Sequence, residues 1–122
     1  MTPEQNKTIH RAISVFGAKN QKMQTIEELI ELQKELFENV HRETDNRKNI
    51  LEEVTDVEVM LAQIKEIYGF DQQQIEDMKA YKIGRLNRTI DKYLASQKED
   101  QTIEQDNHEV HILRTISNER KD

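Results

Sequence analysis

Residues that favour tight turns are scarce in this chain, which has three glycines and one proline among its 122 residues. A sheet protein of this length needs many turns and is rich in β-branched and aromatic residues, yet aromatic residues make up only 5% here. Glutamate, lysine, glutamine, leucine and isoleucine dominate instead, and most of these favour helices. The sequence therefore predicts an all-α fold made of long helices.

Residues that start or stop helices divide the first part of the chain into four predicted helices. Thr2 as N-cap and Pro3 at the first helical position begin the first helix, and Gly17 ends it. Gly69 ends the third helix, and Asp71 is expected to cap the fourth. The predicted helices span about 3–16, 21–41, 47–68 and 72–95. Because the connections are short, neighbouring helices are expected to pack as an antiparallel bundle.

Composition divides the chain into a helical domain at 1–95 and a polar tail at 96–122. The tail opens with the polar run 96–102, and we expect it to be mobile with at most one short helix near 109–117. Hydrophobic residues make up 34% of the whole chain, and charged residues also 34%. A monomer so poor in apolar residues has a thin core, so a second subunit is expected to complete the bundle.

Charge and hydropathy exclude several classes of function. The net charge of −6 argues against nucleic acid as a partner. The chain has no cysteine, which excludes disulfides and zinc–thiolate sites. Its apolar runs are too short for a membrane span, and its polar N-terminus does not resemble a signal peptide. We therefore expect a cytoplasmic protein with no membrane partner.

An acidic pair interrupts the apolar face of the third predicted helix. At about 100° per residue, the apolar residues of this helix fall within one arc of the helical wheel. These residues are Ile50, Val54, Val57, Met60, Leu61, Ile64, Ile67 and Tyr68. Glu53 falls inside the arc and Asp56 falls at its edge. A carboxylate buried there without a partner would be unfavourable by several kcal/mol.

Two interpretations account for Glu53 and Asp56. Carboxylates three residues apart share a helix face and can bind one metal ion, and Mg²⁺ prefers such hard oxygen ligands. A lysine or arginine from a neighbouring helix would also compensate the two charges. The third helix by itself leaves both interpretations open.

The second predicted helix has an apolar and a polar stripe on roughly opposite sides. The apolar residues, expected to face the core, are Ile26, Leu29, Ile30, Leu36, Phe37 and Val40. The polar stripe contains Gln21, Gln24, Glu28, Glu31 and Glu35. Taken by itself, such a stripe predicts a solvated face, with a cleft or a subunit interface as the alternative.

The fourth predicted helix carries cations where apolar residues are expected. Its apolar arc contains Ile75, Met78, Leu86, Ile90 and Tyr93. Lys82 falls near the middle of that arc, with Arg85 close by. The run Lys79, Lys82, Arg85 and Arg88 is a basic cluster in an acidic chain. Either Glu53 and Asp56 or a bound triphosphate would neutralise it.

These motifs together resemble the MazG-like, all-α nucleoside triphosphate pyrophosphohydrolases. That family carries a Glu-x-x-Glu pair on one helix and a Glu-x-x-Asp pair on the next, which correspond here to residues 28–31 and 53–56. Residues 16–21 ahead of the first pair and the basic segment 82–86 are also similar to family motifs. The resemblance covers roughly residues 5–95.

The resemblance implies a metal site made of both acidic pairs. In the family these pairs converge on Mg²⁺, for which Mn²⁺ can substitute, at a bundle interface. Glu28, Glu31, Glu53 and Asp56 would then be the metal ligands and catalytic residues, and one of the glutamates would activate water instead. Family members are dimers or dimer-based tetramers.

The resemblance also implies a substrate and a reaction. The family hydrolyses the α–β anhydride of nucleoside triphosphates to a monophosphate and pyrophosphate, which fits cleansing of the nucleotide pool. Lys82 and Arg85, with Lys79, would contact the phosphates. Phe16 and Gln21 would contact the base or sugar, although Phe16 also fits the core.

The sequence is also open to three other interpretations. A helical adaptor with the same fold and no catalysis would use its glutamates in solvated faces. A ferritin-like metal bundle needs Glu-x-x-His on two helices, and the main helices offer only Glu38 with His41. His108 and His111 in the tail have metal-ligand spacing, but no further ligands are evident.

Overall fold

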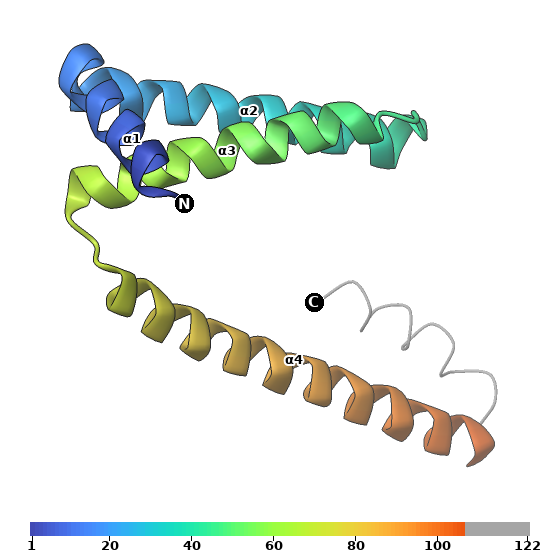
Figure 1. Cartoon of the computed structure of the whole chain (residues 1–122). Helices are drawn as coiled ribbons and strands as arrows, with labels where there is room; N and C mark the ends of the chain where they lie inside the picture. The colour runs from blue at the N-terminus through green and yellow to red at the C-terminus, as the bar shows by residue number, and fades with distance from the viewer. Residues whose placement is uncertain (107–122) are drawn as a thin grey trace. The chain divides into compact units, whose positions relative to one another are not determined.

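A computed structural model describes the backbone of residues 1–106 and the side chains of residues 1–100. Within that range it contains four helices and no strand (Figure 1), which confirms the all-α prediction. The helices are α1 (Pro3–Phe16), α2 (Ala18–Arg42), α3 (Arg47–Tyr68) and α4 (Gln72–Asp106). Two units are distinguished: Met1–Asp71 contains α1 to α3, and the second unit begins with α4 at Gln72.

Most helix ends lie where the sequence predicts them. The Thr2 hydroxyl accepts a hydrogen bond from the Gln5 amide at 3.1 Å, and the Gln5 side chain accepts one from the Thr2 amide at 2.9 Å. This capping box starts α1 at Pro3 as predicted. Gly17, with φ of 90°, and Gly69, with φ of 69°, end α1 and α3 in backbone conformations that favour glycine.

Two helix boundaries differ from the prediction. Helix α2 begins at Ala18, ahead of the predicted start at Gln21. Helix α4 continues to Asp106, so the predicted end at Ala95 is wrong. The polar residues that follow Ala95 include neither glycine nor proline, and most of them are good helix formers. The predicted short helix at 109–117 lies outside the described residues, as do His108 and His111.

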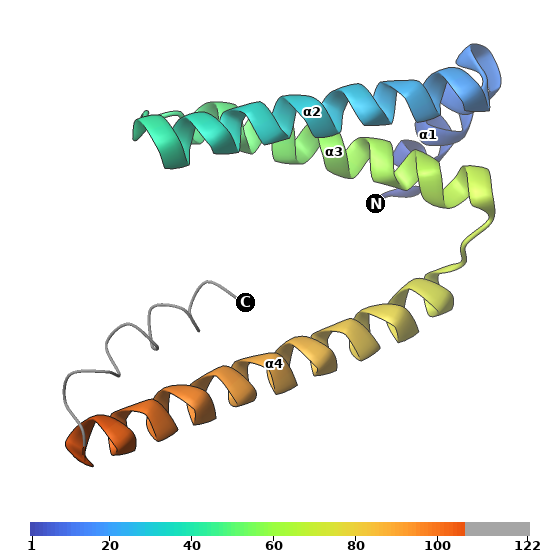
Figure 2. The same ribbon diagram turned by 180° about the vertical axis from the view of Figure 1, so that it is seen from behind.

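Within Met1–Asp71, helices α2 and α3 form an antiparallel pair, and α1 packs against both (Figure 2). Ile9 of α1 is buried. Next to it, the His10 ring nitrogen Nδ1 lies 2.5 Å from the Glu66 carboxylate of α3. An apolar side chain and a polar contact thus both help to attach α1 to the pair.

Helices α2 and α3 meet along what we call the α2–α3 seam, in which polar side chains are frequent. The members of the seam are buried or half-buried and are separated by three or four residues on each helix. On α2 they are Gln21, Thr25, Glu28, Leu32 and Glu35. On α3 they are Ile50, Glu53, Val57, Met60 and Gln63, preceded by Asn46 at the N-cap.

The predicted apolar core stripe of α2 does not face the core of this chain, so that prediction is corrected. Its six residues are exposed, from 45% for Ile30 to 67% for Val40. The apolar arc of α3 divides: Val57 and Met60 are buried, whereas Leu61 is 41% exposed. A helical wheel identifies an apolar stripe, but it does not show whether the covering surface belongs to the same chain.

None of the helices within residues 1–106 has an apolar stretch long enough to cross a membrane.

The seam predicts an unusual response to mutation at Gln21 and Gln63. The Gln21 amide donates to Gln63 Oε1 at 2.7 Å, and both side chains are buried. Replacing Gln63 by alanine leaves that donor unsatisfied and is expected to lower the free energy of unfolding by about 1–3 kcal/mol. Replacing both residues by leucine should be less destabilising than Gln63→Ala. Urea unfolding measures both changes, and a neutral Gln63→Ala would contradict the burial of this pair.

Candidate metal centre

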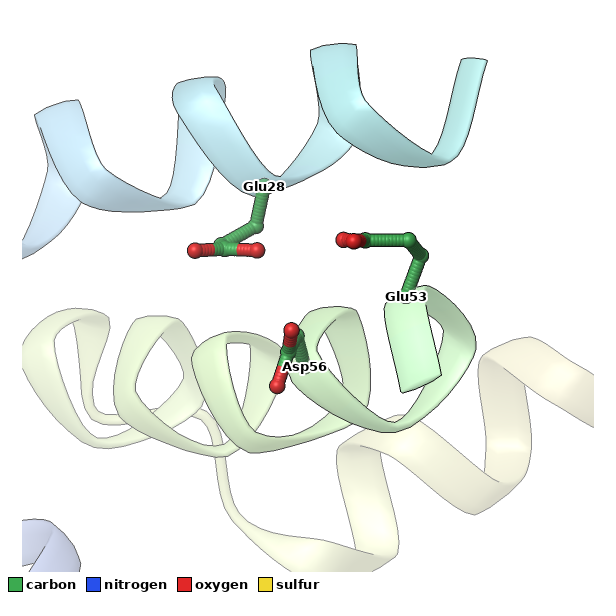
Figure 3. Close-up of side chains that lie close together, drawn as sticks. All are labelled: Glu28, Glu53 and Asp56. Carbon is green, nitrogen blue, oxygen red and sulfur yellow. The ribbon is translucent and has the colours of Figure 1, made fainter. Parts of the chain in front are cut away.

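Three carboxylates from two helices converge at the middle of the seam (Figure 3): the half-buried Glu28 and Glu53 belong to the seam, and the exposed Asp56 lies at its edge. Glu28 extends from α2, while Glu53 and Asp56 lie one turn apart on α3. One oxygen of each lies within 4.8 Å of the others. Oxygens bound to one Mg²⁺ lie at most about 4.2 Å apart, since each Mg–O distance is about 2.1 Å. Small side-chain movements would therefore be enough to bring the three acids onto one ion.

Glu53 is the acid that most requires a cation. Its Oε2 atom is buried and accepts no hydrogen bond from the described residues. Loss of water around the carboxylate raises the pKa of Glu53, and repulsion by neighbouring acids raises it further. In order of effect, these acids are Asp56, Glu28, Glu31 and Glu35. The charged form of Glu53 is thus disfavoured unless a positive ion lies beside it.

The salt-bridge interpretation of Glu53 and Asp56 finds no partner within Met1–Asp71. The ion pairs of this unit involve Lys7, Lys34, Arg42 and His10, and none of them reaches the three converging acids. The Glu28 carboxylate accepts one hydrogen bond, from Gln24 Nε2 at 2.9 Å. A neutral amide orients this carboxylate without neutralising it.

Glu31, the fourth predicted ligand, is not part of the converging group. It is exposed, and its Oε1 lies 3.2 Å from the Lys34 ammonium. It is still close enough to affect Glu53, whose pKa it raises. Three of the four predicted acids therefore meet, and the fourth lies one turn further along α2.

The predicted solvated face of α2 is wrong for three of its five residues. Gln21 is buried, and Glu28 and Glu35 are half-buried, because they face α3. Gln24 and Glu31 are exposed as that interpretation expected. A polar stripe and an apolar stripe compete for the same partner helix, and here hydrogen bonds to α3 accompany the polar one.

The other predicted site residues lie in varied surroundings. The Gln21 amide donates a hydrogen bond to Gln63. Phe16, at the end of α1, is 59% exposed and does not lie in a core. Lys79, Lys82 and Arg85 are exposed on α4, and Lys79 lies 3.6 Å from Glu76. Since α4 belongs to the second unit, their approach to the acids stays a prediction.

Two residues near the three acids, Asn46 and Glu35, were not among the predicted site residues. Asn46 Nδ2 donates to Glu35 Oε2 at 2.6 Å, and Glu35 in turn raises the pKa of Glu53. The heptad spacing of Gln21, Glu28 and Glu35 is visible in the sequence and could have indicated Glu35. No such signal indicated Asn46, since its partner lies on another helix.

No protein-family model, characterised protein or solved structure matches the chain in comparisons with known proteins. The resemblance to the MazG-like family accordingly rests on the sequence motifs. The convergence of Glu28, Glu53 and Asp56 is a separate observation that does not depend on it.

The raised pKa of Glu53 predicts how stability depends on pH without metal. A carboxyl group whose pKa is higher in the folded state stabilises the fold below its ordinary pKa of about 4.3. That stabilisation is lost as the pH rises through the raised value. Metal-free Glu53→Gln is therefore expected to melt above the wild type at neutral pH, with the difference shrinking on acidification, as measured by circular dichroism.

With Mg²⁺ bound, the wild type should melt at a higher temperature than Glu53→Gln. At a concentration 100 times its Kd, bound Mg²⁺ would stabilise the wild type by about 2.7 kcal/mol. Glu53→Gln should show little of this gain, whereas Glu52→Gln, at the exposed neighbouring position, should retain it. An equal response to Mg²⁺ in the wild type and Glu53→Gln would contradict the site.

Proposed function

We propose that the protein is a Mg²⁺-dependent nucleoside triphosphate pyrophosphohydrolase. Its substrate would be a ribo- or deoxynucleoside triphosphate, and its products a nucleoside monophosphate and pyrophosphate. The observation that carries this proposal is the convergence of Glu28, Glu53 and Asp56 around a buried, unpartnered Glu53 oxygen. The motifs shared with the MazG-like family support the choice of reaction. The role that we propose is cleansing of the cytoplasmic nucleotide pool.

In this mechanism Glu28, Glu53 and Asp56 hold the ion in the seam. When bound, Mg²⁺ supplies charge neutralisation for the triphosphate and polarises the phosphorus that is attacked. Glu31 lies one turn from Glu28, is exposed, and is not one of the three converging acids. We assign it the task of orienting the attacking water and accepting its proton.

The phosphates also require cations from the protein. We propose that Lys82 and Arg85, with Lys79, bind the triphosphate and stabilise the charge on departing pyrophosphate. Their exposure on α4 supports this assignment. Within Met1–Asp71, no lysine or arginine pairs with the three converging acids.

We further propose that two copies of the chain pair through the outer face of the α2–α3 hairpin. That face exposes the six apolar residues of α2 together with Val54 and Leu61 of α3. Exposed apolar residues gathered on one side of a helix pair are typical of an interaction site. A twofold pairing of the same surface would cover it in both copies, giving a homodimer or a tetramer made of two such dimers.

The activity is tested by measuring pyrophosphate release from a panel of canonical and modified triphosphates with and without Mg²⁺. Glu53→Gln and Asp56→Asn should each lower the Mg²⁺-dependent rate by about a hundredfold or more, since both remove a metal ligand. Glu52→Gln is the matched control and should stay active. Full activity in either ligand variant, with the fold intact, would contradict the site.

Lys82→Ala should raise KM for the triphosphate more than it raises the Mg²⁺ concentration needed for half-maximal activity. The reason is that Lys82 would contact phosphate and not the metal ligands. Lys92→Ala, on the same helix and also exposed, serves as the control. An equal loss of substrate and metal affinity in Lys82→Ala would indicate a salt bridge to the acids instead.

The dimer is tested by sedimentation equilibrium. Phe37→Glu should shift the protein to monomers, because it places a charge in the proposed apolar interface. Val59→Glu should leave the dimer intact, since Val59 is also exposed but lies on the opposite side of α3 from Leu61. A wild type that is monomeric at high concentration would refute the pairing. A dimer without hydrolysis would favour the adaptor interpretation.

A further inference from the structure

The amide of Asn46 ties the end of α2 to the start of α3. Asn46 is 7% exposed and is the N-cap residue of α3. Its Nδ2 donates to two oxygens of Glu35, the carboxylate Oε2 at 2.6 Å and the main-chain carbonyl at 2.8 Å. Its Oδ1 accepts from Asn39 Nδ2 at 3.3 Å. We call this group the Asn46 clasp.

Asn46 occupies an N-cap position but does not make the hydrogen bond that is usual there. Asparagine at an N-cap typically accepts a hydrogen bond from a backbone amide in the first turn of its own helix, which stabilises the helix start. In α3 the Asn46 side chain makes no such cap. It is committed to Glu35 of the neighbouring helix instead. Asn46 therefore does not cap its own helix and instead forms a hydrogen bond that joins α2 to α3.

The Asn46 clasp lies in the same register as the acidic site. Glu35 follows Glu28 by seven residues on α2, and Asn46 precedes Glu53 by seven residues on α3. In an antiparallel pair, equal steps in opposite directions along the chain reach the same level. Seven residues rise about 10.5 Å, or two turns, so each pair faces across the seam on the same side. The register that joins Asn46 to Glu35 is therefore the one that brings Glu53 opposite Glu28.

Fully buried apolar side chains are few in this seam, where Leu32 and Ile50 are only half-buried. Among the described residues, the buried hydrophobic side chains are Ile9, Val57 and Met60, and the first of these is on α1. A slip of one residue along a helix moves a side chain by about 1.5 Å, which is large beside a metal–oxygen bond of about 2.1 Å. Directional hydrogen bonds define such positions more sharply than a thin apolar contact.

We propose that Asn46 is a positioning residue for the metal centre, holding Glu35 so that α2 presents Glu28 at the correct level to Glu53 and Asp56. This inference rests on the metal centre of the proposed function, but not on the reaction. It assigns Glu35 a role through its hydrogen bonds with Asn46 and not through contact with the ion.

The test measures Mn²⁺ binding to the full chain by electron paramagnetic resonance of the free ion. Asn46→Ser is the main variant: serine still caps a helix but is too short to reach Glu35. We expect its Kd for Mn²⁺ to rise by about tenfold, as for other residues that orient metal ligands. Its helix content should stay close to wild type, and although the lost hydrogen bonds lower its unfolding midpoint, it should remain folded under the conditions of the measurement. Asn49→Ala, at an exposed position in the first turn of α3 and outside the Asn46 clasp, is the control and should bind as wild type.

Variants of Glu35 distinguish its hydrogen bond with Asn46 from the effect of its negative charge on Mn²⁺ binding. Glu35→Gln keeps an acceptor for Asn46 and should bind Mn²⁺ nearly as well as the wild type. Glu35→Ala should weaken binding as Asn46→Ser does, and the double variant should be no weaker than either single one. If the two losses multiplied in the double variant, Asn46 would not act through Glu35.

The outcomes distinguish this inference from the proposed function. Wild-type affinity in a folded Asn46→Ser variant would overturn the positioning role and leave the function untouched. A wild type that binds Mn²⁺ but releases no pyrophosphate from any triphosphate would overturn the function and leave the positioning role. A wild type that binds no Mn²⁺ would overturn both.

Discussion

Helices α2 and α3 meet through amides and carboxylates in places where paired helices usually bury apolar side chains. Hydrogen bonds satisfy both ends of the seam, through Gln21 with Gln63 and through Asn46 with Glu35. The middle holds three acids that no lysine or arginine of Met1–Asp71 neutralises. As a consequence, the apolar stripe of α2 lies on the outer face of the hairpin. One constraint thus accounts for both the convergence of the three acids and the exposed apolar residues of α2.

This arrangement links stability to function. Without a cation, loss of water around Glu53 and then repulsion by the neighbouring acids raise its pKa, which works against the folded state at neutral pH. A bound ion would relieve the repulsion, so the residues that weaken the metal-free fold are those that would bind the ion. The acids repel one another at one point, whereas the polar groups at both ends of the seam are hydrogen-bonded. Such a local concentration of unfavourable charge is typical of functional sites.

The sequence predicted the helices well because their ends depend on local signals. Pro3, Gly17 and Gly69 act within one turn, and α1 and α3 begin and end as expected. The position of Glu53 inside an apolar arc likewise needed only a helical wheel. The side of α2 that packs against α3 was predicted incorrectly. A helical wheel shows that Ile26 and Phe37 belong to an apolar stripe, but it does not show which surface covers them. Asn46 was missed because its hydrogen bond spans two helices.

The central claim is that Glu28, Glu53 and Asp56 bind one divalent cation in the seam. Its most direct test is anomalous X-ray diffraction from crystals of the full chain grown with Mn²⁺. The claim predicts one strong anomalous peak about 2.2 Å from an oxygen of each of the three acids. It also predicts that this peak disappears in Glu53→Gln. A peak elsewhere, or none in well-ordered wild-type crystals, would contradict the claim.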